Sequence, residues 1–469
     1  MTWRPHPPVL VQITLRRLAG RLHQIQRTGV GPWRHPVRWT VAGLSLTLLL
    51  GWALLMLPVA STGPIPGARV ALFTVVSATC AVGMTLVDTG STWSGFGQAV
   101  ILLLVEIGGL AMMVTATLLG LVAATRLGLH SRLVSRSPSG SVDLATVRQV
   151  VRGSLLIALT AQFLTFLALL ARLLLGYHYP WGRACSHALF HAVSAFNNAG
   201  LSLWPDNVAG FSGDPLILLT LLAAVIAGGL GYPVLIETLR VRPVRRWSVH
   251  TRLTLVVTFI LLVVGPVALL VGEWHNPDTL GGLTPGTRVL SGIFDGIAPR
   301  TAAFHTIDYA DADASTLLVL DLLMVVGAGS GGTAGGIKVT TVAVLVLAVV
   351  AEVRGNTDID VFDRRLAAGT IRQALAVVGL ALAVIGVVVL TLLESTGDAL
   401  GEVLFDVSSA FGSVGLTTGV TAALPPAEQY LMIALMLVGR VGPIAVATTL
   451  ALRPTRNSYR NPEARPILG

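Results

Sequence analysis

Long apolar runs dominate this sequence and constrain its fold more than any other feature. Each is close to the ~20 residues that a helix needs to cross a bilayer. Eight such runs can be recognised, at 40–60, 97–125, 153–175, 215–239, 252–272, 315–351, 372–393 and 428–452. Only 12% of the residues are charged, which is too few to cover the surface of a water-soluble enzyme. The sequence therefore predicts an all-α polytopic membrane protein with eight transmembrane helices.

Basic residues gather in one set of connections between these runs. The segments 126–152, 240–252 and 352–372, together with the two tails, hold 25 of the 32 basic residues. By the positive-inside rule, these parts of the chain face the cytoplasm. We therefore expect both tails, 1–38 and 453–469, to be cytoplasmic.

The other four connections are acidic. They carry four arginines against 13 aspartates and glutamates, and they span 61–96, 176–214, 273–314 and 394–427. An acidic outer mouth raises the local concentration of cations. Sidedness alone also depletes arginine there, so both interpretations stay open for any single carboxylate.

The four acidic connections are similar to one another. Each contains a half-length apolar stretch followed by small residues: FTVVSATCAVGMT at 73–85, FHAVSAFNNAGLS at 190–202, FDGIAPRTAAFHT at 294–306 and FDVSSAFGSVGLT at 405–417. Their alignment gives one equivalent position to Gly83, Gly200, Ala303 and Gly415. This repetition predicts four tandem copies of helix, re-entrant segment and helix.

The re-entrant segments predict a cation pathway. Non-helical backbone cannot face lipid, because its unpaired polar groups would be too costly there, so we expect four such segments to converge on one centre. Glycine allows positive φ, and rings of inward carbonyls replace the water shell of a monovalent cation. The half-helices also aim the negative ends of their dipoles at this centre. The competing interpretation is that the small residues only allow close helix packing.

A glycine-rich segment interrupts the sixth run. The segment GAGSGGTAGG at 327–336 contains Gly327, Gly329, Gly331, Gly332, Gly335 and Gly336. Glycine at this density breaks a helix, and a helix broken inside the membrane must line a water-filled cavity. Lys338 follows directly, either as part of the same structure or as an anchor that extends to the cytoplasmic interface.

Arg440 lies in the middle of the apolar run 430–452. A guanidinium at this depth costs at least ~2.5–3.5 kcal/mol, so it is expected to face the interior of the bundle or a cavity. One interpretation is a structural ion pair with Glu106 or Glu237, the acidic residues inside other runs.

Five motifs carry a resemblance to a known family: SAFNNAGLS at 194–202, APRTAAF at 298–304, GSGGTAGGIKVTT at 329–341, SAFGSVGLTTG at 409–419 and GRVGP at 439–443. In this combination the chain resembles the Trk/Ktr/HKT superfamily of potassium transporters, most closely the bacterial KtrB/TrkH-like pore-forming subunits. The resemblance implies a pseudo-fourfold pore with one filter strand per repeat, in a bacterial cell membrane. It also implies a homodimer that sits on a cytoplasmic ring of nucleotide-binding regulatory subunits (KtrA/TrkA-like).

The resemblance also assigns residues to the filter and the gate. The filter strands would be Cys80, Ala81, Val82 and Gly83; Asn197, Asn198, Ala199 and Gly200; Arg300, Thr301, Ala302 and Ala303; and Gly412, Ser413, Val414 and Gly415. The backbone carbonyls that bind potassium or sodium would be those of Val82, Ala199, Ala302 and Val414. The gate would consist of the loop at 327–336, with Lys338, and of Arg440, whose charge opposes cation passage until the loop moves.

The third repeat departs from the family pattern, because Ala303 stands where potassium-conducting members have glycine. In this superfamily, replacement of a filter glycine is associated with weaker discrimination against sodium. A Cβ disfavours positive φ by ~1–2 kcal/mol. We therefore expect a potassium pathway that admits sodium more readily than an all-glycine relative. The neighbouring His305 is either a pH sensor or a hydrogen-bonded loop residue.

The predicted organisation follows from these assignments. It comprises a basic tail at 1–38, pore repeats at 39–125, 126–240, 241–352 and 353–452, and a second tail at 453–469. The sequence contains neither a phosphate-binding loop nor a metal-ligand cluster nor a nucleophile with an evident base. We therefore expect no enzyme activity, no nucleic-acid partner, and no cofactor besides the transported ion. The alternative function is a coupled secondary transporter of an organic solute, whose site is also built from discontinuous helices.

Overall fold

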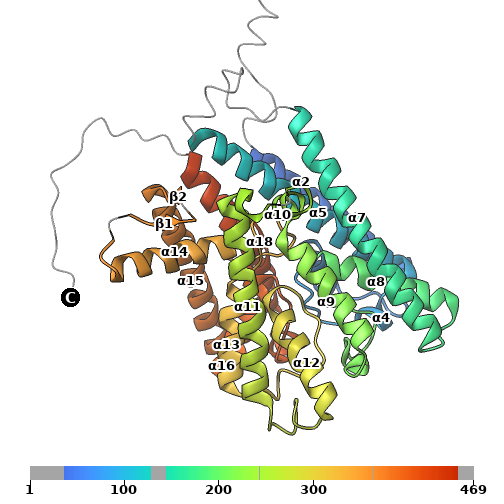
Figure 1. The fold of residues 1–469 in the computed structure, drawn as a ribbon. Helices are drawn as coiled ribbons and strands as arrows, with labels where there is room; N and C mark the ends of the chain where they lie inside the picture. The colour runs from blue at the N-terminus through green and yellow to red at the C-terminus, as the bar shows by residue number, and fades with distance from the viewer. Residues whose placement is uncertain (1–35, 128–143, 242, 357, 363, 453–469) are drawn as a thin grey trace, which may run out of the picture. The chain divides into compact units, whose positions relative to one another are not determined.

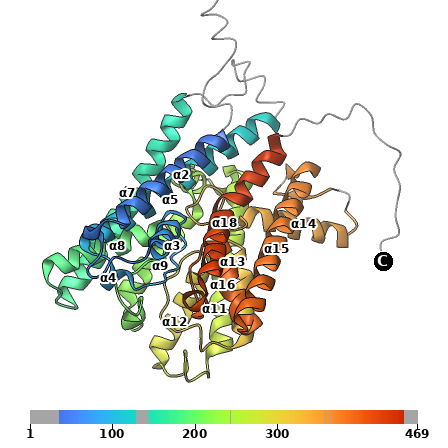
Figure 2. The same ribbon diagram turned by 180° about the vertical axis from the view of Figure 1, so that it is seen from behind.

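The computed structural model of the chain is almost entirely helical (Figure 1, and Figure 2 from behind). It describes residues 36–127, 144–241, 243–356, 358–362 and 364–452, so most of the first predicted tail and all of the second lie outside the described residues. The chain divides into two compact units, residues 1–46 and residues 47–469. The described part of the first unit is helical, and all contacts discussed below lie within the second.

The elements follow one another along the chain as helices, with one short hairpin. They are α2 (Pro36–Leu55), η2 (Pro58–Ala60), α3 (Ala68–Thr79), α4 (Thr89–Thr92), α5 (Gly95–Leu127), α7 (Leu144–Leu175), α8 (Trp181–Phe196), η3 (Ala209–Phe211), α9 (Pro215–Leu230), α10 (Tyr232–Arg240), η4 (Val244–Arg246), α11 (Val249–Glu273), α12 (Pro285–Ile297), η5 (Ala298–Arg300), α13 (Ala314–Val325), α14 (Val339–Val353), β1 (Asp360–Val361), β2 (Arg364–Arg365), α15 (Ala368–Thr396), α16 (Leu400–Gly412), α17 (Val420–Ala423) and α18 (Pro426–Leu452). The predicted all-α class is confirmed.

Each predicted apolar run coincides with helix, but the helices differ in length. Among the described residues, four are long and apolar enough to cross a membrane: Gly95–Gly120, Thr146–Leu175, Val249–Glu273 and Gly369–Thr396. The helices α9 and α10 would together make a fifth, but they are bent by 98° at Gly231, whose φ is +86°. Four further apolar helices of the described part are shorter, namely Ala42–Leu55, Ala68–Thr79, Ala314–Val325 and Val339–Val353, and α18 is not among the four long ones. The count of eight crossings therefore stays a prediction.

Ordinary local signals set the ends of these helices. Asp214 caps α9, since its Oδ1 accepts a hydrogen bond from the backbone N–H of Leu216 at 3.0 Å, and Pro215 fills the first helical position. Ser248 caps α11 by accepting from the N–H of Thr251 at 3.2 Å. Gly397 ends α15 in the left-handed conformation, at φ +73°.

Four half-length helices, α3, α8, α12 and α16, have 12 to 16 residues. At 1.5 Å per residue they extend for about 18–24 Å, which is too short to cross a bilayer. α3, α8 and α16 lead directly into a non-helical segment, and α12 does so after the 3₁₀ turn η5. A half-helix followed by such a segment is what the repeat pattern predicts. The half-helix α16 lies beside α13 in both views, and α12 packs along α11 (Figures 1 and 2).

Candidate functional site

The four predicted filter strands come together at the ends of the four half-helices, with Arg300 still in η5 and Gly412 still in α16. They occupy 80–83, 197–200, 300–303 and 412–415, where every residue is buried except the half-buried Gly83. The first strand contacts two others: a Cβ built on Gly83 would lie 2.0 Å from the carbonyl oxygen of Ala199 and 2.7 Å from the Cβ of Ala303. The strands therefore meet so closely at Gly83 that only glycine fits there.

Two further contacts complete the set. A Cβ on Gly200 would lie 2.1 Å from the backbone nitrogen of Ala303, and one on Gly415 would lie 2.0 Å from the carbonyl oxygen of Val82. Each strand thus contacts at least one other through its backbone. The structure brings the four segments together as the sequence analysis expected.

Three of the four strands share one backbone conformation. In each, the residue two positions before the glycine is left-handed although it is not glycine: Ala81 (φ 46°), Asn198 (φ 58°) and Ser413 (φ 55°). The glycines are left-handed too: Gly83 (φ 93°), Gly200 (φ 64°) and Gly415 (φ 92°). A left-handed residue with a Cβ costs ~1–2 kcal/mol, so the surrounding packing imposes this shape.

The third strand has a different backbone. Its half-helix ends in the 3₁₀ turn η5, and none of residues 298–304, all of which the structure describes, has a positive φ. Ala303 lies nine positions after Phe294, whereas the glycine lies ten positions after the leading phenylalanine in the other repeats. Ala303 therefore belongs to a strand whose backbone conformation differs from the other three. Its φ is not positive, so its Cβ causes no left-handed strain.

The carbonyl of Ala303 is occupied by two side chains of the outer loops. Nδ2 of Asn207 donates to it at 2.9 Å, and Nδ1 of His305 lies 3.0 Å away. Because a carbonyl only accepts, Nδ1 of His305 must carry the proton. Burial lowers the pKa of His305 below its ordinary value, against the opposing effects of the Ala303 carbonyl and of Asp308. His305 is thus a hydrogen-bonded loop residue, the second of the two interpretations.

A serine six residues before each filter glycine braces the three similar strands. Oγ of Ser77 accepts from the N–H of Gly83 at 3.1 Å, and Oγ of Ser409 accepts from the N–H of Gly415 at 2.9 Å. The third serine, Ser194, instead donates to the carbonyl of Leu201, at 2.8 Å. The sequence analysis missed these serines, although their spacing of six residues from the glycine recurs in three repeats. The third repeat has Ile297 at the equivalent position.

Glycines on the helices that follow allow the C-terminal ends of three half-helices to pack closely against them. A Cβ on Gly108, Gly228 or Gly439 would lie within 2.0 Å of a backbone carbonyl oxygen, each time that of the residue four before the filter glycine: Thr79, Phe196 and Phe411. Small residues therefore allow close packing on these later helices. The close-packing alternative was made for the re-entrant segments themselves, so these contacts do not decide it.

Glu106 of α5 supports the second strand from behind. Its Oε2 accepts from Nδ2 of Asn197 and from Nε2 of Gln162, both at 2.7 Å. Its Oε1 has no hydrogen-bond partner among the described residues. The side chain of Asn197 is therefore turned toward α5. Sequence reasoning considered Glu106 only as a partner for Arg440.

The glycine-rich loop closes on itself between α13 and α14, which confirms the predicted break of the sixth run. The N–H of Gly327 donates to the carbonyl of Ile337 at 2.9 Å, so the two ends of the loop are paired. The middle of the loop docks on the bend between α9 and α10, where the N–H of Thr333 donates to the carbonyl of Gly228 at 3.1 Å. The N–H of Tyr232 donates to the carbonyl of Gly331 at 3.2 Å.

The same loop contacts the ends of two half-helices. Oγ1 of Thr333 donates to the carbonyl of Phe196 at 3.2 Å, and a Cβ on Gly335 would lie 2.2 Å from Oγ of Ser413. Lys338 does not extend to an interface: it is 7% exposed, and its ammonium donates to the carbonyl of Ala334 at 2.7 Å. It therefore belongs to the loop structure.

Arg440 ties this loop to α5. Nη1 donates to the carbonyl of Thr333, and Nη2 donates to the carbonyl of Gly108 at 3.3 Å. No ion pair joins Arg440 to a carboxylate within the described ranges. The alternative pair with Glu106 or Glu237 is therefore not observed, because these carboxylates accept hydrogen bonds from other groups.

The expected acidic mouth is only partly exposed. Four of its 13 carboxylates are buried: Asp214, Glu273, Asp295 and Asp406. Others are exposed to solvent, namely Asp206, Asp278, Asp308, Asp311, Asp313 and Glu394. Asp214 pairs with Arg172 at 2.7 Å, and the other three accept hydrogen bonds from backbone, hydroxyl or amide groups. The count of acidic residues therefore overstates the charge available to attract cations.

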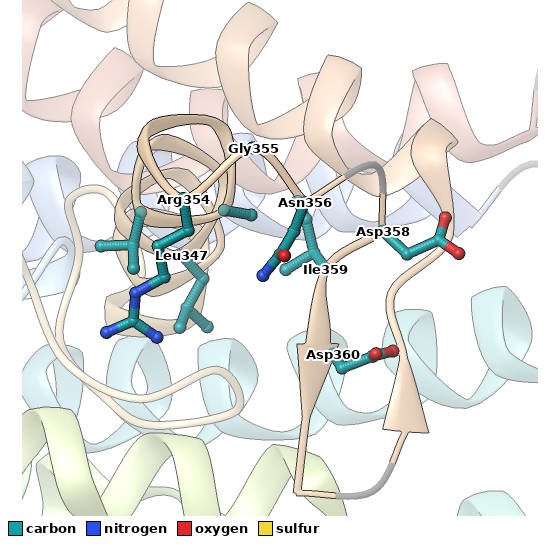
Figure 3. Close-up of a pocket in the computed structure, with 9 residues that line it drawn as sticks. Leu347, Arg354, Gly355, Asn356, Asp358, Ile359 and Asp360 are labelled. Atoms are coloured by element: carbon teal, nitrogen blue, oxygen red, sulfur yellow. The ribbon is translucent and has the colours of Figure 1, made fainter.

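One pocket lies away from all of these segments, between the end of α14 and β1 (Figure 3). Its lining residues are Leu347, Val350, Ala351, Arg354, Gly355, Asn356, Asp358, Ile359 and Asp360. No predicted filter or gate residue lines it.

Comparison with known proteins agrees with this geometry. A family model described as "TrkH: Cation transport protein" matches residues 55–460. The chain is similar to the Ktr system potassium uptake protein B of Bacillus subtilis (strain 168), at 35% identity over 436 residues, 92% of this chain and 97% of that protein. It is also similar to the potassium/sodium uptake protein NtpJ of Enterococcus hirae, at 33% identity over 441 residues, covering 92% and 97%. The crystal structure of the potassium transporter TrkH from Vibrio parahaemolyticus has the same fold, with a TM-score of 0.66 and 18% identity, covering 88% of this chain and 85% of that chain.

Proposed function

Since the chain belongs to the TrkH family of cation transport proteins, we propose that it takes up potassium, with sodium as a second cation, across the bacterial cell membrane. The cations pass between the four strands at 80–83, 197–200, 300–303 and 412–415. The observation that carries this proposal is the meeting of four buried strands, backbone against backbone, after four half-helices. Backbone carbonyls of Val82, Ala199, Ala302 and Val414 supply the ligands that replace the water around the ion.

The gate in this proposal is the loop at 327–336 together with Lys338 and Arg440. Its support is the set of contacts that place the loop against Phe196 and Ser413, at the ends of the second and fourth half-helices. A loop held there obstructs the path of an ion that has passed the strands. Movement of the loop requires Arg440 to release the carbonyl of Thr333.

The wider assembly is part of the same proposal. The chain forms four tandem pore repeats, with eight crossings in pseudo-fourfold arrangement and both termini in the cytoplasm. The Bacillus subtilis relative is named as part of a Ktr system, which supports a multi-component transporter. We accordingly assign this chain the role of the pore-forming subunit, as a homodimer on a cytoplasmic nucleotide-binding ring, with no enzyme activity of its own.

Flux into liposomes tests the function directly. Vesicles that contain the purified protein are expected to accumulate ⁸⁶Rb⁺ down its gradient when no other solute gradient is present. Empty vesicles give the background. Uptake that requires an added organic solute would instead support the coupled secondary transporter.

Replacement of Ala303 by glycine tests the role of the third strand. The strand has no left-handed residue, so glycine relieves no backbone strain there, and Asn207 still holds the carbonyl. Potassium-conducting members of the superfamily have glycine at this place, so we expect the ⁸⁶Rb⁺ to ²²Na⁺ uptake ratio to rise by roughly two- to fivefold, which corresponds to a change of ~0.5–1 kcal/mol in cation preference. Identical ratios for the two proteins would contradict a role of Ala303 in sodium entry.

Replacement of Glu106 by alanine is expected to free the amide of Asn197 and lower ⁸⁶Rb⁺ uptake. Loss of one charged hydrogen bond of ~1.5 kcal/mol corresponds to roughly tenfold. Glu106→Gln keeps an acceptor at the same place and should retain most of the uptake. Both variants are compared at equal protein per vesicle, and full uptake by the alanine variant would show that Glu106 does not support the strand.

A further inference from the structure

The residue after the leading phenylalanine occupies the same place in each half-helix and is polar in all four. These residues are Thr74, His191, Asp295 and Asp406. Three of them are fully buried, with no exposed surface: His191, Asp295 and Asp406. Each of these three side chains accepts a hydrogen bond from the segment that follows its filter strand. In each case one donor is a backbone N–H at the same position of the repeat.

In the fourth repeat, Asp406 holds the chain just beyond the filter strand. Its Oδ1 accepts from the N–H of Thr418 at 2.8 Å, and its Oδ2 accepts from Oγ1 of Thr417 at 2.7 Å. The N–H of Thr421 adds a further bond to Oδ2 at 2.8 Å. Both carboxylate oxygens are thus engaged by protein donors.

In the third repeat, Asp295 does the same. Its Oδ1 accepts from the N–H of Thr306 at 2.8 Å, and its Oδ2 accepts from the hydroxyl of the same residue. The hydroxyl of Tyr309 lies 3.4 Å from Oδ1. This contact is present although the third strand has its own backbone conformation.

In the second repeat, a neutral histidine takes the place of the carboxylate. Nδ1 of His191 lies 2.7 Å from the carbonyl of His187, so Nδ1 carries the proton and Nε2 is left as an acceptor. Nε2 lies 3.0 Å from Oγ of Ser202 and accepts from the N–H of Leu203 at 3.4 Å. The ring of Trp204 stacks on His191 with centroids 3.7 Å apart.

The three acceptors share one partner position. Leu203, Thr306 and Thr418 each lie three residues beyond the position of the filter glycine, which is Gly200, Ala303 or Gly415. The first repeat differs, because Oγ1 of Thr74 donates to the carbonyl of Val70 within its own helix, at 2.9 Å. The same hydrogen bond therefore recurs in three repeats although their backbone conformations differ. This recurrence indicates that the three acceptors have the same role.

We propose that His191, Asp295 and Asp406 are positioning residues that fix the outer ends of their filter strands and thereby set the preference among monovalent cations. The inference rests on the proposed function. A strand anchored at both ends, by its half-helix before the glycine and by this acceptor after it, keeps its carbonyl oxygens at a fixed separation. A strand released at its outer end adapts to a smaller ion, so discrimination falls.

Attraction of cations by carboxylate charge is the competing role. The geometry disfavours it, since the carboxylates are unexposed and bound to N–H and hydroxyl donors, and since a neutral ring does the same in the second repeat. The two roles predict different results at His191, because charge attraction assigns this residue no effect.

The test compares ⁸⁶Rb⁺ and ²²Na⁺ uptake by liposomes that contain the wild type, His191→Leu, His191→Gln or the control Thr74→Val. His191→Leu removes the acceptor and should lower the Rb⁺ to Na⁺ ratio about fivefold, the factor that one hydrogen bond of typical strength is worth. His191→Gln, whose amide oxygen reaches the position of Nε2, should restore the ratio. Thr74→Val should leave it unchanged.

The outcomes separate the inference from the proposed function. A wild type that takes up neither cation overturns both. A wild type that takes up Rb⁺, together with an unchanged ratio in His191→Leu, overturns the inference alone. Should His191→Leu fail to fold, Asp406→Asn decides instead: its amide keeps one acceptor oxygen but places an NH₂ group against the N–H donors, so a lowered ratio supports the proposal and an unchanged ratio overturns it.

Discussion

Alanine at Gly83 or at Gly415 is expected to reduce ⁸⁶Rb⁺ uptake by at least tenfold. A Cβ at either position would lie 2.0 Å from a carbonyl oxygen, that of Ala199 or that of Val82, and both are proposed cation ligands. The φ values of +93° and +92° add a strain of ~1–2 kcal/mol within the strands themselves. A strand distortion of this size corresponds to roughly fivefold to thirtyfold in uptake, whereas the same strain outside the strands leaves uptake unchanged. Since the neighbouring atom is backbone, the clash is relieved only by moving a strand.

Two other glycines separate these effects. Gly397 has a φ of +73° but nothing within 4 Å of an added Cβ, so Gly397→Ala carries the strain without the clash. Gly386 lies inside α15 with the same open surroundings and ordinary helical φ, so Gly386→Ala carries neither. Both controls should keep near-normal uptake. Strong uptake by folded Gly83→Ala and Gly415→Ala would show that the four strands do not line the ion pathway.

The sequence predicts the helical segments well because their signals are local. Apolar runs mark the helices, and the glycine density at 327–336 marks the break between α13 and α14. The repeat pattern also identifies the four segments that meet, since each follows a half-helix of similar composition. Ala303 lies beside Gly83 and Gly200, although alignment on the leading phenylalanine alone would place Phe304 there.

The interactions that fix the site depend on residues far apart in the chain, and no sequence pattern reveals them. The hydrogen bond from Asn207 to the carbonyl of Ala303 spans 96 positions, and that from Arg440 to Gly108 spans 332. The sequence places Asp295 and Asp406 in an acidic outer mouth. In the structure both are buried, and each accepts a hydrogen bond from the backbone N–H three residues beyond its filter strand. Composition gives the sign of their charge, whereas only packing decides whether water or cations can reach it.

Arg440→Ala is expected to raise cation flux about tenfold or more. The guanidinium donates to the carbonyl of Thr333 in the loop and to that of Gly108 in α5, so it fastens the loop where it obstructs the pathway. Hydrogen bonds from a charged donor are worth ~1.5–3 kcal/mol each, and loss of even one shifts the balance between closed and open loop by at least tenfold. The measurement is the initial rate of ⁸⁶Rb⁺ entry at equal protein per vesicle. Slower entry with intact folding would show that Arg440 only stabilises the bundle.

Arg440→Lys separates the two ways in which Arg440 can act. If its positive charge repels the cation directly, lysine preserves the low flux. If its two contacts hold the loop, lysine behaves like alanine, because an ammonium lacks the planar fork of donors that joins two carbonyls on different elements. Arg252→Ala is the matched control: it removes an arginine that also donates to a backbone carbonyl, that of Val244, but lies outside the loop. Arg440 contacts Thr333 on the loop and Gly108 on α5, which favours the second mechanism. We therefore expect both Arg440 variants to conduct faster than the wild type and Arg252→Ala to match it.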